Sequence, residues 1–191
     1  MRRVRLAVAG LVAVAALAAC SGGGEAAQTL PPTSSTSASS SASLPPLGPA
    51  DFPVPAEARQ QTPEGAKAFV AYYVELMSRA QGRLTSGGLR ELASDCEVCA
   101  RFADGIDGYK QLGLTAKGGG IRLDGASAPA LSGSRAEFSV SLTQLTFDLV
   151  DSQGTRRTDL STGQKSFPAS GAATVWSTQN SSWLMAQLTI Q

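Results

Sequence analysis

The chain has 191 residues, among them 16 Lys and Arg, 15 Asp and Glu, and no histidine. The absence of histidine excludes Ser-His-Asp and Cys-His catalysis and removes the commonest metal ligand, so we expect no metal and no cofactor. With Arg2, Arg3, Arg5 and the lone acidic Glu25 set aside, 13 basic and 14 acidic residues leave a net charge of −1 without a basic run, which argues against a nucleic-acid partner.

An uncharged run follows the arginines at the start of the chain. Residues 6–19 are mostly Ala, Val and Leu, a length that suits the apolar part of a signal peptide and is too short for a permanent membrane span. Two alanines precede Cys20, and the four residues Leu17-Ala18-Ala19-Cys20 resemble the lipobox of bacterial lipoproteins. The resemblance implies a signal peptide over residues 1–19 and a lipid on Cys20. An ordinary secretory signal and an uncleaved anchor are the alternatives.

The lipobox sets an expected location. Two or more acyl chains on Cys20 would hold the protein durably, whereas a single chain binds a membrane only marginally. We therefore expect a lipid-anchored protein at the cell membrane, on its extracytoplasmic face.

A Ser/Thr/Pro-rich segment separates this signal from the rest of the chain. Residues 20–50 contain one charge, Glu25, and almost no large apolar residue. Such a segment cannot bury enough surface to offset the entropy of ordering, so we predict a disordered tether with a reach of ~30 Å. O-glycosylation of its hydroxyls is a further possibility. Residues 51–191 then form a single domain, long enough for one core.

A first helix is signalled from residue 62. Thr62 is a candidate N-cap, Pro63 suits the first helical position, and Glu64 favours the positive end of the helix dipole. Gly82 is the expected end. Apolar residues recur at helical spacing and predict a buried stripe: Ala66, Phe69, Val70, Tyr73, Met77 and Ala80.

Two more helices are predicted. A short one over Leu89–Ala93 follows Gly87-Gly88, and Ser94 or Asp95 caps a third from about Cys96 to Leu112. Two glycines weaken this third helix by up to ~1 kcal/mol each relative to alanine. Its apolar face contains Val98, Phe102, Ile106 and Tyr109.

After Gly113 the periodicity changes to that of strands. A first strand is expected from Ile121 through Ala126 to Leu131, and a second, strictly alternating one over residues 136–143. The apolar phase then flips, which predicts a β-bulge and a bend near Thr143-Gln144.

Further strands follow. Residues 151–154 predict a hairpin connection, and residues 155–177 predict a strand or a pair of strands interrupted near Pro168. A turn at 179–182 leads into a last strand, whose faces separate Leu184, Ala186, Leu188 and Ile190 from Trp183 and Met185. Helices followed by antiparallel strands indicate an α+β fold, with a bent sheet of about four strands wrapped around the first helix.

The motif Cys96-Glu97-Val98-Cys99 is the one motif in the chain whose side chains could take part in a chemical reaction. Cysteines at i and i+3 in a first helical turn are close enough to bond, and exported proteins keep disulfides. We expect a Cys96–Cys99 disulfide. A thiol redox protein is an alternative, because a helix N-terminus lowers a thiol pKa, but the redox motif should follow a β-strand and here follows helix. A metal site is the remaining alternative.

The chain resembles an uncharacterised family of actinobacterial lipoproteins, a domain of unknown function. The resemblance covers about residues 52–191. It implies an α+β cone, cystatin-like and similar to the nuclear-transport-factor and ketosteroid-isomerase folds, and it brings no activity. The residues that carry it are the lipobox and tether, Thr-Pro-Glu-Gly-Ala at 62–66, Phe69, Tyr72, Tyr73, Asp95-Cys96-x-x-Cys99 and Trp183.

Aromatic side chains are the candidates for an apolar pocket within such a cone, if they are not simply core or surface residues: Tyr72, Tyr73, Tyr109, Trp176 and Trp183. No catalytic residue stands out. We expect a non-catalytic module that binds an envelope protein, a wall glycan or an apolar, lipid-like ligand. A small cone-fold isomerase, lyase or hydrolase with a carboxylate and tyrosine pocket, and a CxxC redox protein, are the alternatives.

Overall fold

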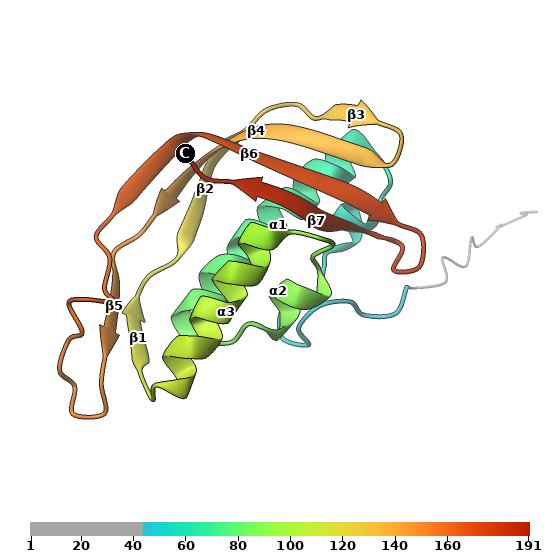
Figure 1. Cartoon of the computed structure of the whole chain (residues 1–191). Coiled ribbons are helices and arrows are strands. Elements are labelled where there is room, and N and C mark those ends of the chain that lie inside the picture. The colour runs from blue at the N-terminus through green and yellow to red at the C-terminus, as the bar shows by residue number, and fades with distance from the viewer. Residues whose placement is uncertain (1–43) are drawn as a thin grey trace, which may run out of the picture. The chain divides into compact units, whose positions relative to one another are not determined.

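The computed structural model describes residues 44–191. The predicted signal peptide, the lipid on Cys20 and the tether up to residue 43 lie outside these residues. The predicted α+β class is confirmed, because helices come first in the chain and pack against antiparallel sheets (Figure 1). The helical elements are the 3-10 helix η1 (Ala56–Arg59), α1 (Pro63–Arg83), α2 (Gly87–Glu91) and α3 (Glu97–Gln111).

The described residues form seven strands, and the bent sheet predicted to have about four has five. Five of them make one antiparallel sheet with the order β2-β4-β6-β7 and with β3 paired to β4, and this sheet curves over the helices in Figure 1. β1 and β5 pair separately. The strands are β1 (Thr115–Gly118), β2 (Ile121–Ala126), β3 (Ala130–Ser132), β4 (Arg135–Gln144), β5 (Phe147–Val150), β6 (Lys165–Ser177) and β7 (Ser182–Thr189).

α1 starts as predicted and ends later. The Gly65 N–H donates to Thr62 Oγ1 at 3.0 Å, so Thr62 is the N-cap. Gly82 does not stop the helix, which continues to Arg83 and ends at Leu84 in a left-handed conformation with φ 49°. Burial of the Leu84 side chain explains the later end, because packing outweighs the cost of that backbone conformation.

The starts of α2 and α3 also differ from expectation. α2 begins at Gly87 and includes both glycines. α3 is capped by Cys96 rather than by Ser94 or Asp95, because the Cys99 N–H donates to Cys96 Sγ at 3.3 Å. The disulfide fixes that sulfur at the first turn of the helix.

Several strand predictions need correction. The expected strand over residues 121–131 is divided into β2 and β3, with Pro129, which has no N–H to donate, just before β3. β1 was not predicted. β4 ends at Gln144 without a bulge there, because the chain leaves the large sheet and joins β1 as β5. Pro168 does not interrupt β6; the register shifts opposite Ser141, which places an extra residue at Pro168-Ala169.

A further correction concerns the last strand. The register of β6 and β7 shifts between Ala173 and Thr174, so β7 gains an extra residue at Ala186. Leu188 therefore joins Trp183 and Met185 on the buried face, while Ile190 is exposed.

Residues 155–164, where strand was expected to begin, contain isolated bridges and no strand. The connection at 151–154 is a turn, in which the Gly154 N–H donates to the Asp151 carbonyl at 3.0 Å.

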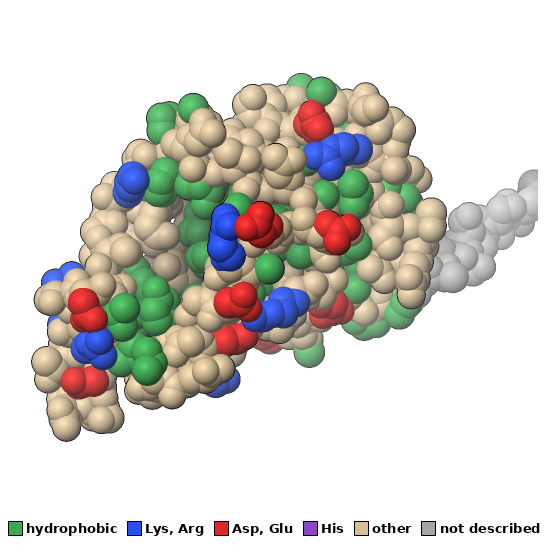
Figure 2. Space-filling view, viewed as in Figure 1, with side chains coloured by type: hydrophobic (Ala, Val, Ile, Leu, Met, Phe, Trp, Pro, Cys, Tyr) green, Lys and Arg blue, Asp and Glu red, His purple; other side chains and the backbone are tan. Residues whose placement is uncertain are grey.

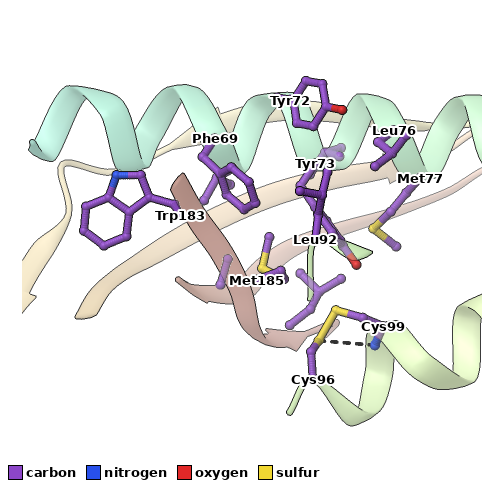
Figure 3. Close-up of a cluster of buried hydrophobic side chains, with 14 of the residues drawn as sticks. Phe69, Tyr72, Tyr73, Leu76, Met77, Leu92, Cys96, Cys99, Trp183 and Met185 are labelled. Carbon is purple, nitrogen blue, oxygen red and sulfur yellow. Dashed lines mark hydrogen bonds between the residues drawn. A yellow bond between two sulfur atoms is a disulfide. The ribbon is translucent and has the colours of Figure 1, made fainter. Parts of the chain in front are cut away.

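The largest buried side chains form what we call the central core, between α1 and β7 (Figure 3). The Trp183 indole N–H donates to the Gln60 carbonyl at 2.7 Å, and the Thr62 N–H donates to the same oxygen at 2.8 Å. A Cβ on Gly65 would lie 2.1 Å from that oxygen, so only glycine fits there. The main members of the central core are Phe69, Tyr73, Met77, Leu92, Trp183 and Met185.

A second cluster of buried side chains lies between α3, the end of α1 and β5, and we call it the distal cluster. It is separate from the central core and packs the end of α1 against α3 and the two-stranded sheet. Its buried members are Leu84, Ile106, Leu114, Phe147 and Leu149.

Residues 44–50, which the sequence assigns to the tether, pack on the domain together with the residues that follow them. Leu47 contacts the central core, and Phe52 stacks on Tyr72 with ring centroids 4.9 Å apart. The Arg59 guanidinium donates to the carbonyls of Pro45 and of Asn180 in the β6–β7 turn. The chain is thus attached to the domain before η1 begins.

Candidate functional site

The domain has a cleft of about 660 Å³, within the usual size range of small-molecule sites. It lies between α3, the end of α1, the β4–β5 junction and the start of β6, and Figure 2 shows hydrophobic side chains in a hollow on this face. We call it the cleft. Its lining residues are Gln81, Arg101, Phe102, Gly105, Ile106, Tyr109, Gln144, Phe147, Thr162, Gly163, Gln164, Lys165 and Phe167.

Helical spacing on α3 forms one wall of the cleft. Phe102, Ile106 and Tyr109 follow one another at intervals of four and three residues, so they share a face. Gly105 lies within the same stretch, and a Cβ at this position would meet no atom within 4 Å. The missing side chain leaves the cleft open where a larger residue would cover it.

Two glutamines supply the polar part of the floor. Gln81 is buried, and its Oε1 accepts from the Gly120 N–H at 2.8 Å and from Gln144 Nε2 at 3.2 Å. Gln144 Nε2 also donates to the carbonyls of Gly120 and Leu145. These backbone partners fix both amides. Within residues 44–191, Gln81 Nε2 and Gln144 Oε1 have no hydrogen-bond partner.

The charges at the cleft are all positive. Arg101 and Lys165 line it and no carboxylate does. Arg101 is paired with Glu97, four residues before it on α3. The Lys165 ammonium lies 4.9 Å from the centre of the Phe167 ring and forms no ion pair with any described residue. The rim therefore attracts anions.

The perturbed tyrosines lie in packed regions instead. Burial raises the pKa of Tyr72 to about 12 and raises the pKa of Tyr73 further above its ordinary value of 10.0. Their hydroxyls donate to the carbonyls of Phe52 and Leu89 at 2.8 and 3.0 Å. Both shifts follow from burial as neutral, hydrogen-bonded groups.

The five aromatic residues proposed as a pocket do not come together. Only Tyr109 lines the cleft, with its ring 6.0 Å from that of Phe147. Tyr73 and Trp183 fill the central core, and Trp176 packs edge-on against Trp183 at 5.5 Å. Tyr72 projects from the opposite side of α1 (Figure 3). The stripe on α1 packs into the central core and does not line the cleft.

Sequence reasoning missed the two glutamines and the phenylalanines contributed by β5 and β6. A signal was present for Gln81, which follows Met77 by four residues and so continues the buried stripe of α1. Gln144, Phe147 and Phe167 meet only through pairing of distant strands.

The expected Cys96–Cys99 disulfide is present, with Cα atoms 5.2 Å apart. Both cysteines are buried against the central core. The element before them is α2 rather than a strand. Residues 44–191 contain no cluster of His, Cys, Asp and Glu able to hold a metal ion. Over the same residues, none of the helices combines the length and apolar character needed to cross a membrane.

Comparisons with known proteins identify the fold and no family. No family model and no curated protein matches the chain. The intermembrane-space region of the chloroplast protein ARC6 aligns with a TM-score of 0.50 at 18% identity, over 69% of this chain and 97% of that one. This likeness shows the α+β fold alone.

Two further structures are more distant. An NTF2-like superfamily protein from Salmonella enterica serovar Typhimurium has a TM-score of 0.37 at 14% identity, over 70% of this chain and 89% of that one. A periplasmic fragment of TraM has a TM-score of 0.37 at 13% identity, over 68% and 97%. Neither carries an argument about function.

Proposed function

We propose that this chain is an extracytoplasmic lipoprotein, anchored through Cys20, whose domain binds a component of the cell envelope without catalysing a reaction. The observation that carries the binding function is the cleft, with its apolar wall, fixed amide pair and positive rim. Membership of the resembled actinobacterial lipoprotein family is part of the same proposal.

Two independent observations support a location outside the cytoplasm. The lipobox at Leu17–Cys20 addresses the chain to the outer face of a membrane. The Cys96–Cys99 disulfide belongs to the domain itself, and disulfides persist in oxidising compartments. The second observation does not depend on the first.

The chemistry of the cleft favours binding over catalysis. Groups with perturbed pKa values tend to gather at active sites, whereas here Tyr72 and Tyr73 lie in packed regions. The groups that line the cleft are amides, hydroxyls, cations and aromatic rings. They suit recognition of a ligand and provide no carboxylate for acid–base work.

A redox role for the CxxC pair has less support. Thiol exchange requires an accessible sulfur, but Cys96 and Cys99 are 5% and 2% exposed. If the protein were a reductase, replacing both cysteines by serine would abolish reduction of insulin by the purified protein. We expect no such activity in the unaltered protein.

Mass spectrometry of the native protein and membrane fractionation test the anchor. We expect a chain that begins at a lipid-modified Cys20 and sediments with membranes. Cys20→Ala should be released or left unprocessed. Ser21→Ala, one residue beyond the lipobox, is the matched control and should remain anchored. A native chain with its first methionine and an unmodified Cys20 in the cytosol would refute the proposal.

A further inference from the structure

We propose that the cleft binds a long-chain fatty acid, with the acyl chain along the aromatic wall and the carboxylate at Lys165. This inference names the ligand of the cleft and therefore rests on the proposed function. It is carried by the apolar composition of the wall and by the charge of the rim.

The wall suits an acyl chain. Ile106 and Phe147 are buried at the floor, and Phe102 and Phe167 rise beside them from α3 and β6. These four side chains present only carbon to the cleft. An acyl chain adapts to such a surface and removes apolar area from water, whereas a sugar needs hydrogen-bond partners around its whole edge.

The rim selects an acid over a neutral lipid. Lys165 has no carboxylate partner within the described residues, and Arg101 is already held by Glu97. A carboxylate beside Lys165 gains an ion pair and a hydrogen bond at a site with no opposing negative charge. The Tyr109 hydroxyl lines the same cleft and is also without a protein partner in residues 44–191. An alcohol or ester would leave the lysine without its counter-ion.

Gly105 provides a way to fill the cleft without disturbing the core. Side chains added at Gly105 and at Gly108 both begin in open space on α3, but only Gly105 lines the cleft. Gly105→Trp should therefore occupy the site, and Gly108→Trp is the matched control on the same helix.

The test uses membranes isolated from cells that make the full chain, without ATP so that no new acylation occurs. The probe is a palmitic acid analogue with a diazirine in its chain and a terminal alkyne. After irradiation, we expect labelled peptides from α3 and the start of β6. Gly105→Trp should lower that labelling at least ~tenfold, since the probe loses its volume, whereas Gly108→Trp should not.

A second pair of variants tests the charge. Lys165→Gln should lower labelling by about threefold to fivefold, the worth of one partly exposed ion pair, while Lys117→Gln on β1 should leave it unchanged. The corresponding alcohol probe lacks the carboxylate, so its labelling of the unaltered protein should be no higher than the labelling of Lys165→Gln by the acid probe. Circular dichroism of each variant verifies folding.

Two kinds of result overturn the inference. In the first, the cleft peptides stay unlabelled, as they would if another protein or the tether occupied the cleft. In the second, the labelling is the same with Gly105→Trp as without it, and the same with the alcohol probe as with the acid. The Cys20 peptide is read in the same sample. A lipid on Cys20 without cleft labelling refutes only the ligand, whereas a bare Cys20 in a chain outside the membrane refutes the proposed function.

Discussion

The two ends of the domain are built from the same layers but filled differently. Around Gln60, the central core leaves no room for even a methyl group on Gly65, and a buried indole satisfies the backbone carbonyl. At the cleft, Gly105 faces empty space, and Gln81 Nε2 and Gln144 Oε1 have no hydrogen-bond partner within residues 44–191. One end is closely packed, and the other leaves the cleft that we propose as the binding site.

Removing the largest core side chain should have the greatest effect on stability. Trp183→Ala deletes a side chain that is 1% exposed together with its hydrogen bond to Gln60, so we expect a loss of about 3–5 kcal/mol in the free energy of unfolding. Phe167→Ala in the cleft wall should cost about 1 kcal/mol, since this side chain is only partly buried. Urea unfolding measures both, and equal losses would abolish the distinction between the two ends.

A methyl group added at the packed end should be nearly as costly. Gly65→Ala brings a Cβ to 2.1 Å from the Gln60 carbonyl, and we expect about 3 kcal/mol of destabilisation from the backbone shift. The same urea titration measures it. A loss below about 0.5 kcal/mol would mean that the first turn of α1 yields easily, contrary to close packing there.

Removing the disulfide should lower the free energy of unfolding by less than either of these core changes. The loop it closes is short, so Cys96→Ser with Cys99→Ser should lower the free energy of unfolding by about 2 kcal/mol. Hydrogen exchange should show the loss of protection concentrated in the first turn of α3, because the bridge joins two residues of that turn. Protection lost evenly over the domain would contradict a local role.

A methyl group added on α3, at the end of the domain that contains the cleft, should stabilise the domain. Gly105→Ala and Gly108→Ala each replace a helical glycine where a Cβ meets nothing, and we expect a gain of about 0.5–1 kcal/mol from each. Thermal unfolding of the two variants and their double mutant measures the gains. A loss at Gly105 alone would show that the cleft closes on that position in solution.

Alkaline pH offers the mildest test of the packed end. Burial raises the pKa of Tyr72 from 10.0 to about 12, so the unfolded chain loses this proton first. The stability it contributes is present below pH 10 and is lost as the pH rises towards 12. Tyr72→Phe should therefore lose stability less steeply over this range, measured by urea unfolding at each pH. Parallel slopes for the two proteins would contradict the shift.

Local signals made much of the packed end predictable. Thr62 and Pro63 identify the start of α1, and the cysteine spacing identifies the disulfide, because in both cases the partners are neighbours in sequence. The alternation over residues 136–143 likewise identifies β4, whose one face is buried. Each of these features is decided within about one turn or one strand of chain.

The cleft was not predictable in this way. Its floor requires Gln81 of α1 to meet Gln144 of β4, a pairing set by the register of the sheet. The extra residues at Pro168-Ala169 and at Ala186 change which side chains face inward, and no periodicity marks them in advance. The chain changes sheet after Gln144, and this reverses the apolar alternation just as a β-bulge would. The alternation therefore located the bend but not its cause.

Arg59 has a mechanical consequence. Its guanidinium clips the entering chain at Pro45 to the turn between β6 and β7, while the cleft lies at the other end of β6, beside Lys165. Tension applied at residue 44 is therefore carried by the hydrogen bonds of Arg59 to the turn, and from there by the backbone hydrogen bonds between β6 and β7. The cleft lies off that path, so we expect tension at residue 44 to leave the arrangement of its lining residues unchanged.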